Sequence, residues 1–513
     1  MKFTRHIIVA CVWLAAALCA SAQCEVEYDA GITANYGKGE IAPYYINSNR
    51  GGTLTQQYSA LLSAALRHEM DTTRRFSYGF GAELWGGYSS SVSYARYDVG
   101  SDRFLRNQQH PARAWVQQLY ADVKYRSLKA TVGAKARQSV MASTDLSSGD
   151  LIMSGNARPG AGIAAGFVNY QTVPFTNGWL QISGELGFER FGDTQWLENH
   201  YNYCNNFLTT GYWFNYKQMH LRTSPNQPVV ATIGAQAACQ FAGTQHIYQN
   251  GILTKSVPMS ANFKSFFRSI IPGSGGDNPG DQVYVEGNHL GSWDMMVEYR
   301  HRRVGKFRAY HQTIWEDGSG IGFQNGFDGL WGLEWRSATR SLVSGVVLEY
   351  IDFTNQSGHV HFSEELNRES PIKGGATGMD DYYNNYSYNG YQNRGMSIGT
   401  PFAKSPIYNT DGYVRYLDNL LRGFHVGVKG YLGSEYVYRL LFSYRTAYGT
   451  AEHPRYKAAH ATCFMLEAVS RPKWLKGLEL KAQFAFDRGS LLGNNTGGLV
   501  AVTYSGDFNI GKK

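Results

Sequence analysis

The sequence predicts an all-β protein, a closed antiparallel transmembrane β-barrel of about eighteen strands in an outer membrane. Three observations predict it: apolar and polar residues alternate strictly in many segments, short and long connections take turns, and no apolar run after the N-terminal segment approaches the roughly 20 residues of a spanning helix. The composition agrees, because 36 Tyr, 26 Phe, 11 Trp and 58 Gly accompany only 14 Pro in 513 residues.

The alternation is clearest in four segments, each with an apolar face and a polar or small-residue face. In 76–84 the apolar face holds Phe76, Tyr78, Phe80, Ala82 and Leu84, and in 478–487 it holds Leu478, Leu480, Ala482, Phe484 and Phe486. Residues 129–137 and 180–189 follow the same rule. Since a soluble sandwich also alternates, this pattern favours a β-structure without choosing between a sandwich and a barrel.

The connection lengths favour the barrel. Strands are predicted near 27–37, 53–70, 74–90, 113–126, 129–139, 159–170, 178–192, 213–224, 229–243, 291–302, 306–315, 329–338, 343–354, 424–432, 436–447, 460–470, 478–490 and 498–510. Tight links such as 71–73, 224–228 and 433–435 alternate with long segments such as 193–212 and 355–423. Short periplasmic turns and long external loops are typical of outer-membrane barrels, whose sheet must close because the membrane core offers no water to backbone groups.

The first residues predict export. Lys2 and Arg5 precede an apolar stretch over 7–18 and the small residues Ala20-Ser21-Ala22, which is the order of a secretory signal peptide. We expect a signal peptide at 1–22, cleaved after Ala22, and one barrel domain with long external loops at 23–513. A lipoprotein acylated at Cys24 is disfavoured, because Gln23 stands where a small residue is expected. The predicted location is the cell outer membrane.

Charge and cysteine content exclude several classes. The formal net charge of +8 is mild and its basic residues are dispersed, so no nucleic-acid partner is predicted. The cysteines beyond the predicted signal are Cys24, Cys204, Cys239 and Cys463, and their spacing matches no disulfide framework. We therefore expect no structural disulfide. Inward faces carry charges of both signs, as at Glu298 and Arg300, which we expect to neutralise each other across neighbouring strands.

Enzyme signatures are scarce, so the sequence predicts neither an enzyme nor a cofactor. It contains no HExxH, nucleophile-elbow or Walker motif. His359 and His361 are two residues apart, a spacing that is more often incidental than metal-binding. The glycine-rich 272–281 follows no buried strand and precedes no helix, so no phosphate-binding loop is predicted there. We also expect no metal site. Glu316 and Asp317 follow one another at a strand end, where adjacent side chains point to opposite sides and cannot act as a catalytic pair.

The external loops supply the predicted binding residues. Segments 146–160 and 378–402 both contain Asn, Asp and Gly, and 378–402 is also rich in Tyr; flat rings and amides can stack on sugars and bond hydroxyls. The polysaccharide-binding candidates are Tyr382, Tyr383, Asn384, Asn385, Tyr388, Asn156, Arg158 and Asp317. The alternative for each residue is that it only orders its loop.

These loops also carry a resemblance. "LSSGDLIMSGNARPG", "YHQTIWEDGSG" followed by "DGLWGLEW", "EYIDFTNQSG" and "DDYYNNYSYNGYQNRGMSIGTPF" together resemble the capsule-assembly Wzi family, from about residue 41 to the C-terminal strand. The resemblance implies an outer-membrane barrel of eighteen strands that holds capsular polysaccharide at the cell surface without catalysis. Members can close the periplasmic end with a helical bundle, whereas the predicted mature chain begins almost at once with a strand.

Two further functions stay open at this point. A porin or substrate-specific channel is the alternative to polysaccharide binding, and it would need an unobstructed lumen with opposed charge clusters at a constriction. An outer-membrane hydrolase or acyltransferase is disfavoured by the missing motifs. The expected partners are capsular or other surface polysaccharide and outer-membrane lipids, and we expect a monomer.

Overall fold

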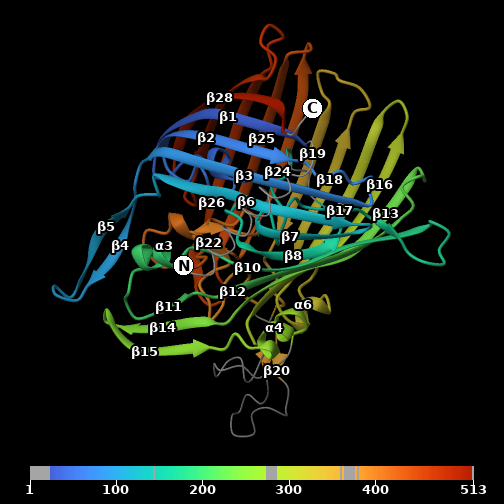
Figure 1. The fold of residues 1–513 in the computed structure, drawn as a ribbon. Helices are drawn as coiled ribbons and strands as arrows, with labels where there is room; N and C mark the ends of the chain where they lie inside the picture. Colours follow the sequence, from blue (N-terminus) through green and yellow to red (C-terminus); the bar gives the residue numbers. More distant parts are fainter. Residues whose placement is uncertain are drawn as a thin grey trace.

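The fold is a closed antiparallel β-barrel, shown in a computed structural model (Figure 1). The structure describes residues 24–141, 145–272, 286–358, 361–362, 376–377 and 380–510. The predicted signal peptide, His359 and nearly all of 272–281 lie outside these residues. No helix within the described ranges is long and apolar enough to cross a membrane.

The wall of the barrel is one sheet. Its strands are β1 (Cys24–Lys38), β2 (Tyr58–His68), β3 (Phe76–Ser89), β6 (Ala114–Tyr125), β7 (Leu128–Ala134), β8 (Ala161–Phe167), β9 (Gln171–Thr172), β10 (Leu180–Arg190), β12 (Trp213–Thr223), β13 (Val229–Phe241), β16 (Asn288–His301), β17 (Gly305–Trp315), β18 (Gly329–Arg336), β19 (Gly345–Asp352), β24 (Leu421–Leu432), β25 (Tyr436–Gly449), β26 (Pro454–Ser470), β27 (Leu478–Arg488) and β28 (Asn495–Ile510). β8 and β9 both pair with β10, so they occupy one place in the wall and the predicted eighteen strands are confirmed.

The first and last strands close the wall. β1 and β28 pair antiparallel from Cys24 opposite Ile510 to Lys38 opposite Thr496. Both ends of the described chain therefore lie at the rim that carries the short links, here called the turn rim, and the long connections lie at the opposite loop rim (Figure 1). This closed pairing leaves no open edge strand in the wall.

The predicted faces are confirmed. On β27 the side chains of Phe484 and Leu480 are 49% and 39% exposed on the outer wall, whereas Gln483 is 6% exposed and points inward. Phe76 and Leu84 of β3 are exposed on the outer wall in the same way. An apolar outer face suits the lipid, because each polar group placed there would lose its hydrogen bonds to water.

Smaller elements lie in the long connections. They are β4 (Val92–Asp98), β5 (Arg103–Gln109), α3 (Thr194–His200), β11 (Phe207–Thr210), β14 (Gly243–Gln249), β15 (Ile252–Met259), α4 (Phe263–Ile270), α6 (Gly318–Ile321), β20 (His361–Phe362), β21 (Ala376–Thr377), β22 (Gln392–Asn393), β23 (Met396–Ser397), η1 (Pro406–Tyr408) and, after β1, α2 (Tyr44–Asn47). β4 and β5 form a hairpin that projects from the loop rim (Figure 1).

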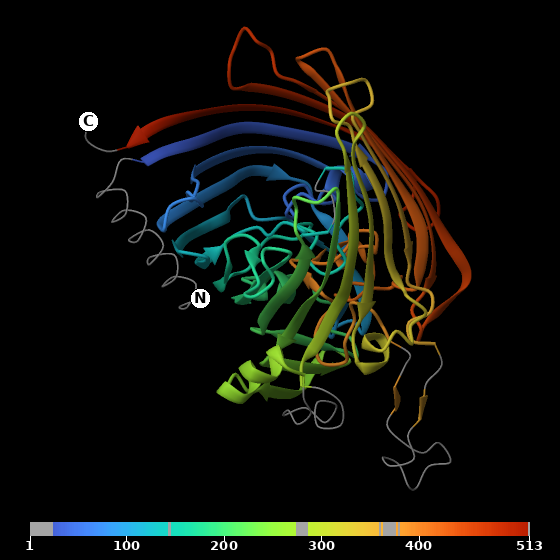
Figure 2. The same cartoon turned by 90° about the vertical axis from the view of Figure 1, so that its right-hand side faces the viewer.

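Three connections enter the barrel and fill much of its interior (Figure 2). We call these residues, 39–57, 135–160 and 380–420, the plug; 142–144 and 378–379 lie outside the described residues. Their buried side chains include Tyr45, Ile46, Leu146, Ile152, Tyr382, Tyr383, Phe402 and Tyr416. They form one hydrophobic core with inward apolar residues of the wall such as Ile314, Val347, Ile351, Leu441 and Met465.

The plug explains two of the places where strand boundaries depart from prediction. β7 ends at Ala134 although 129–139 was expected to be a strand, because Gly133 has a φ of +116° and the chain then turns inward. A Cβ on Gly133 would lie 2.1 Å from the carbonyl oxygen of Leu119, so only glycine fits. Likewise β2 begins at Tyr58 rather than at 53, since the residues before it belong to the plug.

Charged residues on the inner wall pair across neighbouring strands, as predicted. Glu298 of β16 lies 3.2 Å from Lys306 of β17, and Arg308 of β17 bonds Glu334 of β18 at 2.7 Å. Within β16, Glu298 also lies 2.6 Å from Arg300. Pairing offsets much of the desolvation cost of each charge.

Candidate functional site

The inner segment 380–420 is held by the carboxylate of Glu316. Its two oxygens accept hydrogen bonds from the backbone N–H groups of Asp381 at 3.2 Å and Tyr383 at 3.0 Å. Asp317 turns away from this contact and caps α6, since its Oδ1 accepts from the N–H of Ser319 at 2.8 Å. The two adjacent acids thus face different partners, and each fixes the geometry of a loop.

Hydrogen bonds also tie the plug segments to one another. The hydroxyl of Tyr383 donates to the carbonyl of Leu151 at 2.9 Å, and that of Tyr391 donates to the carbonyl of Ile152 at 3.0 Å. Asn156 accepts from the N–H of Asn49 at 2.9 Å and donates to the carbonyl of Ser397 at 3.0 Å. Asn156 therefore joins all three segments.

The plug also reaches the wall. Glu349 of β19 accepts from the N–H of Ser148 at 2.7 Å and from the hydroxyl of Ser147 at 2.6 Å. Arg445 of β25 is fully buried, with its guanidinium 3.9 Å from the ring centre of Tyr44 and 4.2 Å from that of Phe402. These contacts lie on the β16–β28 side of the wall, so the plug packs mainly against that side.

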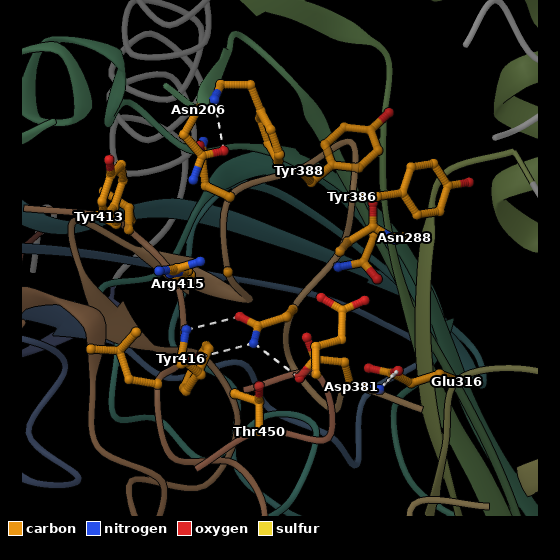
Figure 3. Close-up of a pocket in the computed structure, with 18 of the residues that line it drawn as sticks. Asn206, Asn288, Glu316, Asp381, Tyr386, Tyr388, Tyr413, Arg415, Tyr416 and Thr450 are labelled. Carbon is orange, nitrogen blue, oxygen red and sulfur yellow. Dashed lines mark hydrogen bonds between the residues drawn. The ribbon is translucent and has the colours of Figure 1, made fainter. Parts of the chain in front are cut away.

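A cavity of about 660 Å³, here called the vestibule, lies on the loop-rim side of the plug (Figure 3). Its lining mixes acids, amides and tyrosines and includes Asn206, Asn288, Glu316, Asp381, Tyr386, Tyr388, Tyr413 and Arg415. Segment 380–390 forms part of this lining, whereas the side chains of Tyr382 and Tyr383 are 0% exposed and face the plug core.

The eight predicted binding residues are divided among three places. Asp317, Asn384, Asn385 and Tyr388 come together around the vestibule. Tyr382, Tyr383 and Asn156 are fully buried inside the plug. Arg158, two residues after Asn156, does not line the vestibule but borders two other cavities.

Those two cavities follow one another along the inner wall. The outer cavity lies beside the β4–β5 hairpin and is lined by residues that include Gln109, His110, Trp196 and Arg394. The inner cavity, of about 210 Å³, lies where segment 135–160 leaves the wall after β7 and returns before β8. Arg158 borders both cavities, with its guanidinium 4.9 Å from the ring centre of Trp115. We call the two cavities together the wall passage.

Between the inner cavity and the turn rim, the inner wall of the barrel borders solvent. The side chains of Arg67, Lys129 and Lys135 are 33%, 27% and 38% exposed, although they lie on the inner face of the barrel. This contrasts with the β16–β28 side, where the plug covers most inward side chains. The wall passage therefore meets water toward the turn rim.

Along the wall passage the carboxylates are paired with cations, whereas several arginines have no carboxylate partner in the described structure. Arg137 contacts both Glu185 and Glu189, and Arg67 lies 3.7 Å from Glu83. In the described part of the chain, Arg50, Arg158 and Arg394 have no carboxylate within ion-pair distance. Burial, followed by the charge of Arg394, lowers the pKa of Arg158 to about 9, which leaves it a cation at neutral pH.

Sequence reasoning missed most of this passage. Arg50, Arg137 and Glu189 belong to separate segments, and only the folded plug brings them to the inner cavity, while Arg394 lines the outer one. The alternation in 129–137 placed Arg137 on a polar face, which was the one available signal. Of the predicted binding residues, Arg158 alone lines the passage.

Three buried acids, Glu316, Asp328 and Asp380, predict that the stability of the inner segment 380–420 depends on pH. Burial raises the pKa of Asp328 to about 7 and that of Asp380 to about 6, and it raises the pKa of Glu316 well above its ordinary value. Because the folded pKa of each acid is raised, its contribution to loop stability is full below about pH 4 and is lost as pH rises through 6 and 7. We expect proteases to cut 380–420 faster at pH 8 than at pH 5, in protein reconstituted in vesicles. Asp380→Asn should weaken this pH dependence, and equal cutting rates in the unmodified protein would contradict the assignment.

Comparison with known proteins gives structural matches alone. No protein family and no curated protein matches the chain. Among solved structures, OccK5 (OpdH) of Pseudomonas aeruginosa has 8% identity and a TM-score of 0.42, covering 95% of this chain and 99% of its own. OccD3 (OpdP) of the same organism has 9% identity and a TM-score of 0.43, covering 96% and 92%. OccAB4 of Acinetobacter baumannii has 10% identity and a TM-score of 0.38, covering 95% and 99%.

The predicted polysaccharide-binding function is wrong. The similar solved structures are substrate-specific outer-membrane channels rather than capsule-assembly proteins. The paired tyrosines at the centre of the prediction, Tyr382 and Tyr383, are buried in the plug, so their rings cannot stack on a surface polymer. The physical reason is that long aromatic loops bury more apolar area inside the barrel than they would at the surface. The resemblance to the Wzi family stays a prediction.

Proposed function

We propose that this chain is an outer-membrane channel for small anionic solutes, which move along the wall passage. The observation that carries the proposal is that two cavities share Arg158 in their linings. They lie between the loop rim and the solvent-exposed inner wall near the turn rim. The plug narrows the lumen to this side, so a solute has to pass within reach of the wall side chains.

The charges along the passage support an anionic solute. Arg50, Arg158 and Arg394 have no carboxylate partner among the described residues, whereas Glu83 and Glu189 are paired with arginines. A carboxylate or phosphate group can accept bidentate hydrogen bonds from a guanidinium, and a site lined by one sign of charge concentrates the opposite ion. The passage is proposed as a route for transport, and no catalytic step is assigned to it.

Solute uptake by reconstituted vesicles tests the proposal. We expect vesicles that contain the protein to swell in small carboxylates faster than in neutral sugars of similar size, because the uncompensated arginines favour anions. Arg158→Gln should lower the carboxylate rate severalfold and change the sugar rate little. Lys255→Gln, an exposed cation of β15 outside the passage, is the matched control. Equal impermeability to both solutes, or a faster sugar rate, would refute the proposal.

A further inference from the structure

Helix α4 lies against the outside of the barrel near the loop rim. The outward side chains Phe188 of β10, Trp213 of β12 and Phe241 of β13 surround Phe266 of α4, with ring centres 5.0–5.2 Å from it. The Nζ of Lys217, also on the outer wall, donates to the carbonyl of Ser269 at 2.7 Å. These contacts fix the helix on the wall.

The fixed helix leaves an apolar stripe uncovered. Phe263 and Phe267 are 88% and 54% exposed, and their spacing of four residues places them on one face of the helix. Ile271, which follows the helix, is 56% exposed. Side chains of this size are seldom left in water without a partner when they form a continuous patch. The helix is short and amphipathic, as are helices that lie in a membrane interface.

A groove of about 410 Å³ runs between this stripe and the wall. Its lining is apolar throughout: Gly162, Ile163, Phe188, Trp213, Phe263, Phe266, Phe267 and Ile270. Ile163 of β8 is 56% exposed on the outer wall, like Met219 of β12 at 57% and Ile233 of β13 at 58%. The groove is thus continuous with the surface that faces lipid acyl chains.

Cations stand beside the groove. Lys264 is exposed on α4, and Arg190 lies over the ring of Trp213 at 5.4 Å while its Nη2 donates to the carbonyl of Gly211 at 2.7 Å. Neither cation has a carboxylate within ion-pair distance among the residues that the structure describes. Tryptophan and basic residues at this level are typical of the boundary between acyl chains and headgroups.

We propose that the groove binds one acyl chain of an anionic lipid of the outer leaflet, with the lipid phosphate beside Lys264 and Arg190. The lipid chain covers the exposed phenylalanines, and the phosphate meets cations that the protein leaves uncompensated. This site is independent of the wall passage, because it lies on the opposite face of the sheet.

Lipid retention by the purified protein tests the site. Protein in detergent is mixed with phosphatidylglycerol or phosphatidylcholine, and bound lipid is counted by native mass spectrometry. We expect one phosphatidylglycerol to be retained in preference to phosphatidylcholine. Ile163→Trp fills the groove and should weaken retention about tenfold, the equivalent of about 1.4 kcal/mol. Ile233→Trp, at an equally exposed isoleucine of the outer wall away from the groove, should leave retention unchanged.

A second variant separates headgroup from chain. Lys264→Gln combined with Arg190→Gln should remove the preference for phosphatidylglycerol while phosphatidylcholine is retained as before. Equal retention by the Ile163→Trp and Ile233→Trp proteins would overturn the proposal. Dimers that are lost on Ile163→Trp, with no bound lipid in the unmodified protein, would also overturn it and would assign the groove to a second copy of this chain.

Discussion

Phe484→Arg is expected to prevent assembly of the barrel into a bilayer. Phe484 is 49% exposed on the outer wall, in the middle of β27 and beside Phe486 at a ring-centre distance of 6.3 Å. A charged side chain at mid-membrane on the lipid face costs roughly 2–4 kcal/mol. That cost is a large fraction of the stability of an ordinary domain. The measurement is the fraction of folded protein in vesicles, followed by its altered electrophoretic mobility before and after heating.

Two controls separate charge from shape. Phe484→Leu keeps an apolar side chain and should assemble normally. Gln483→Ala changes the neighbouring inward residue, which accepts a hydrogen bond from Arg50 at 2.6 Å, and should cost only about 1 kcal/mol. Normal assembly of the Phe484→Arg protein would show that this face of β27 does not meet lipid.

Removal of residues 355–419, which include nearly all of the inner segment 380–420, is expected to enlarge the pore. Replacing 355–419 by a short Gly-Ser linker joins β19, which ends at Asp352, to β24, which begins at Leu421. The deletion takes away the buried core of Tyr382, Tyr383 and Tyr416, so single-channel conductance should rise severalfold. The wall should still close, because the strand pairings of β19 with β24 do not involve the removed residues.

A point variant tests the same idea with less disruption. Glu316→Ala leaves the N–H groups of Asp381 and Tyr383 without their acceptor, at a cost of about 1–3 kcal/mol for buried groups. We expect brief openings to a larger conductance in this variant. Asp102→Ala, at an exposed acid of the β4–β5 connection, should behave like the unmodified protein. Unchanged conductance in both the deletion and the Glu316→Ala protein would mean that the segment does not narrow the lumen.

The wall of the barrel could be predicted from the sequence because its signal is local. Alternation on β27 places Leu480 and Phe484 outward and Gln483 inward, and each link length follows from residues close together in the chain. A strand in a closed barrel has lipid on one side and lumen on the other, so its period of two survives into the sequence. The boundary errors at the end of β7 and the start of β2 lie where the chain leaves the wall for the plug or returns from it, whereas β26 begins at Pro454, six residues before its predicted start.

The plug could not be predicted in the same way. Its core joins Tyr45, Ile152 and Tyr383, which come from three separate connections, and no periodic pattern marks a loop that turns inward. Glycine at 133 was visible in the sequence, but the need for a positive φ there depends on the position of Leu119 in the neighbouring strand. The burial of Tyr382 and Tyr383 follows from this long-range packing, which is why the sequence predicted these two rings at the surface although the structure buries them.

The central claim, that anions cross the barrel beside Arg158, is tested most directly by the reversal potential of single channels in a planar bilayer. Under a salt gradient we predict discrete conductance steps and a reversal potential on the anion-selective side, displaced toward zero by Arg158→Gln. A folded protein that conducts no ions in repeated reconstitutions, or a reversal potential on the cation-selective side, would contradict the account.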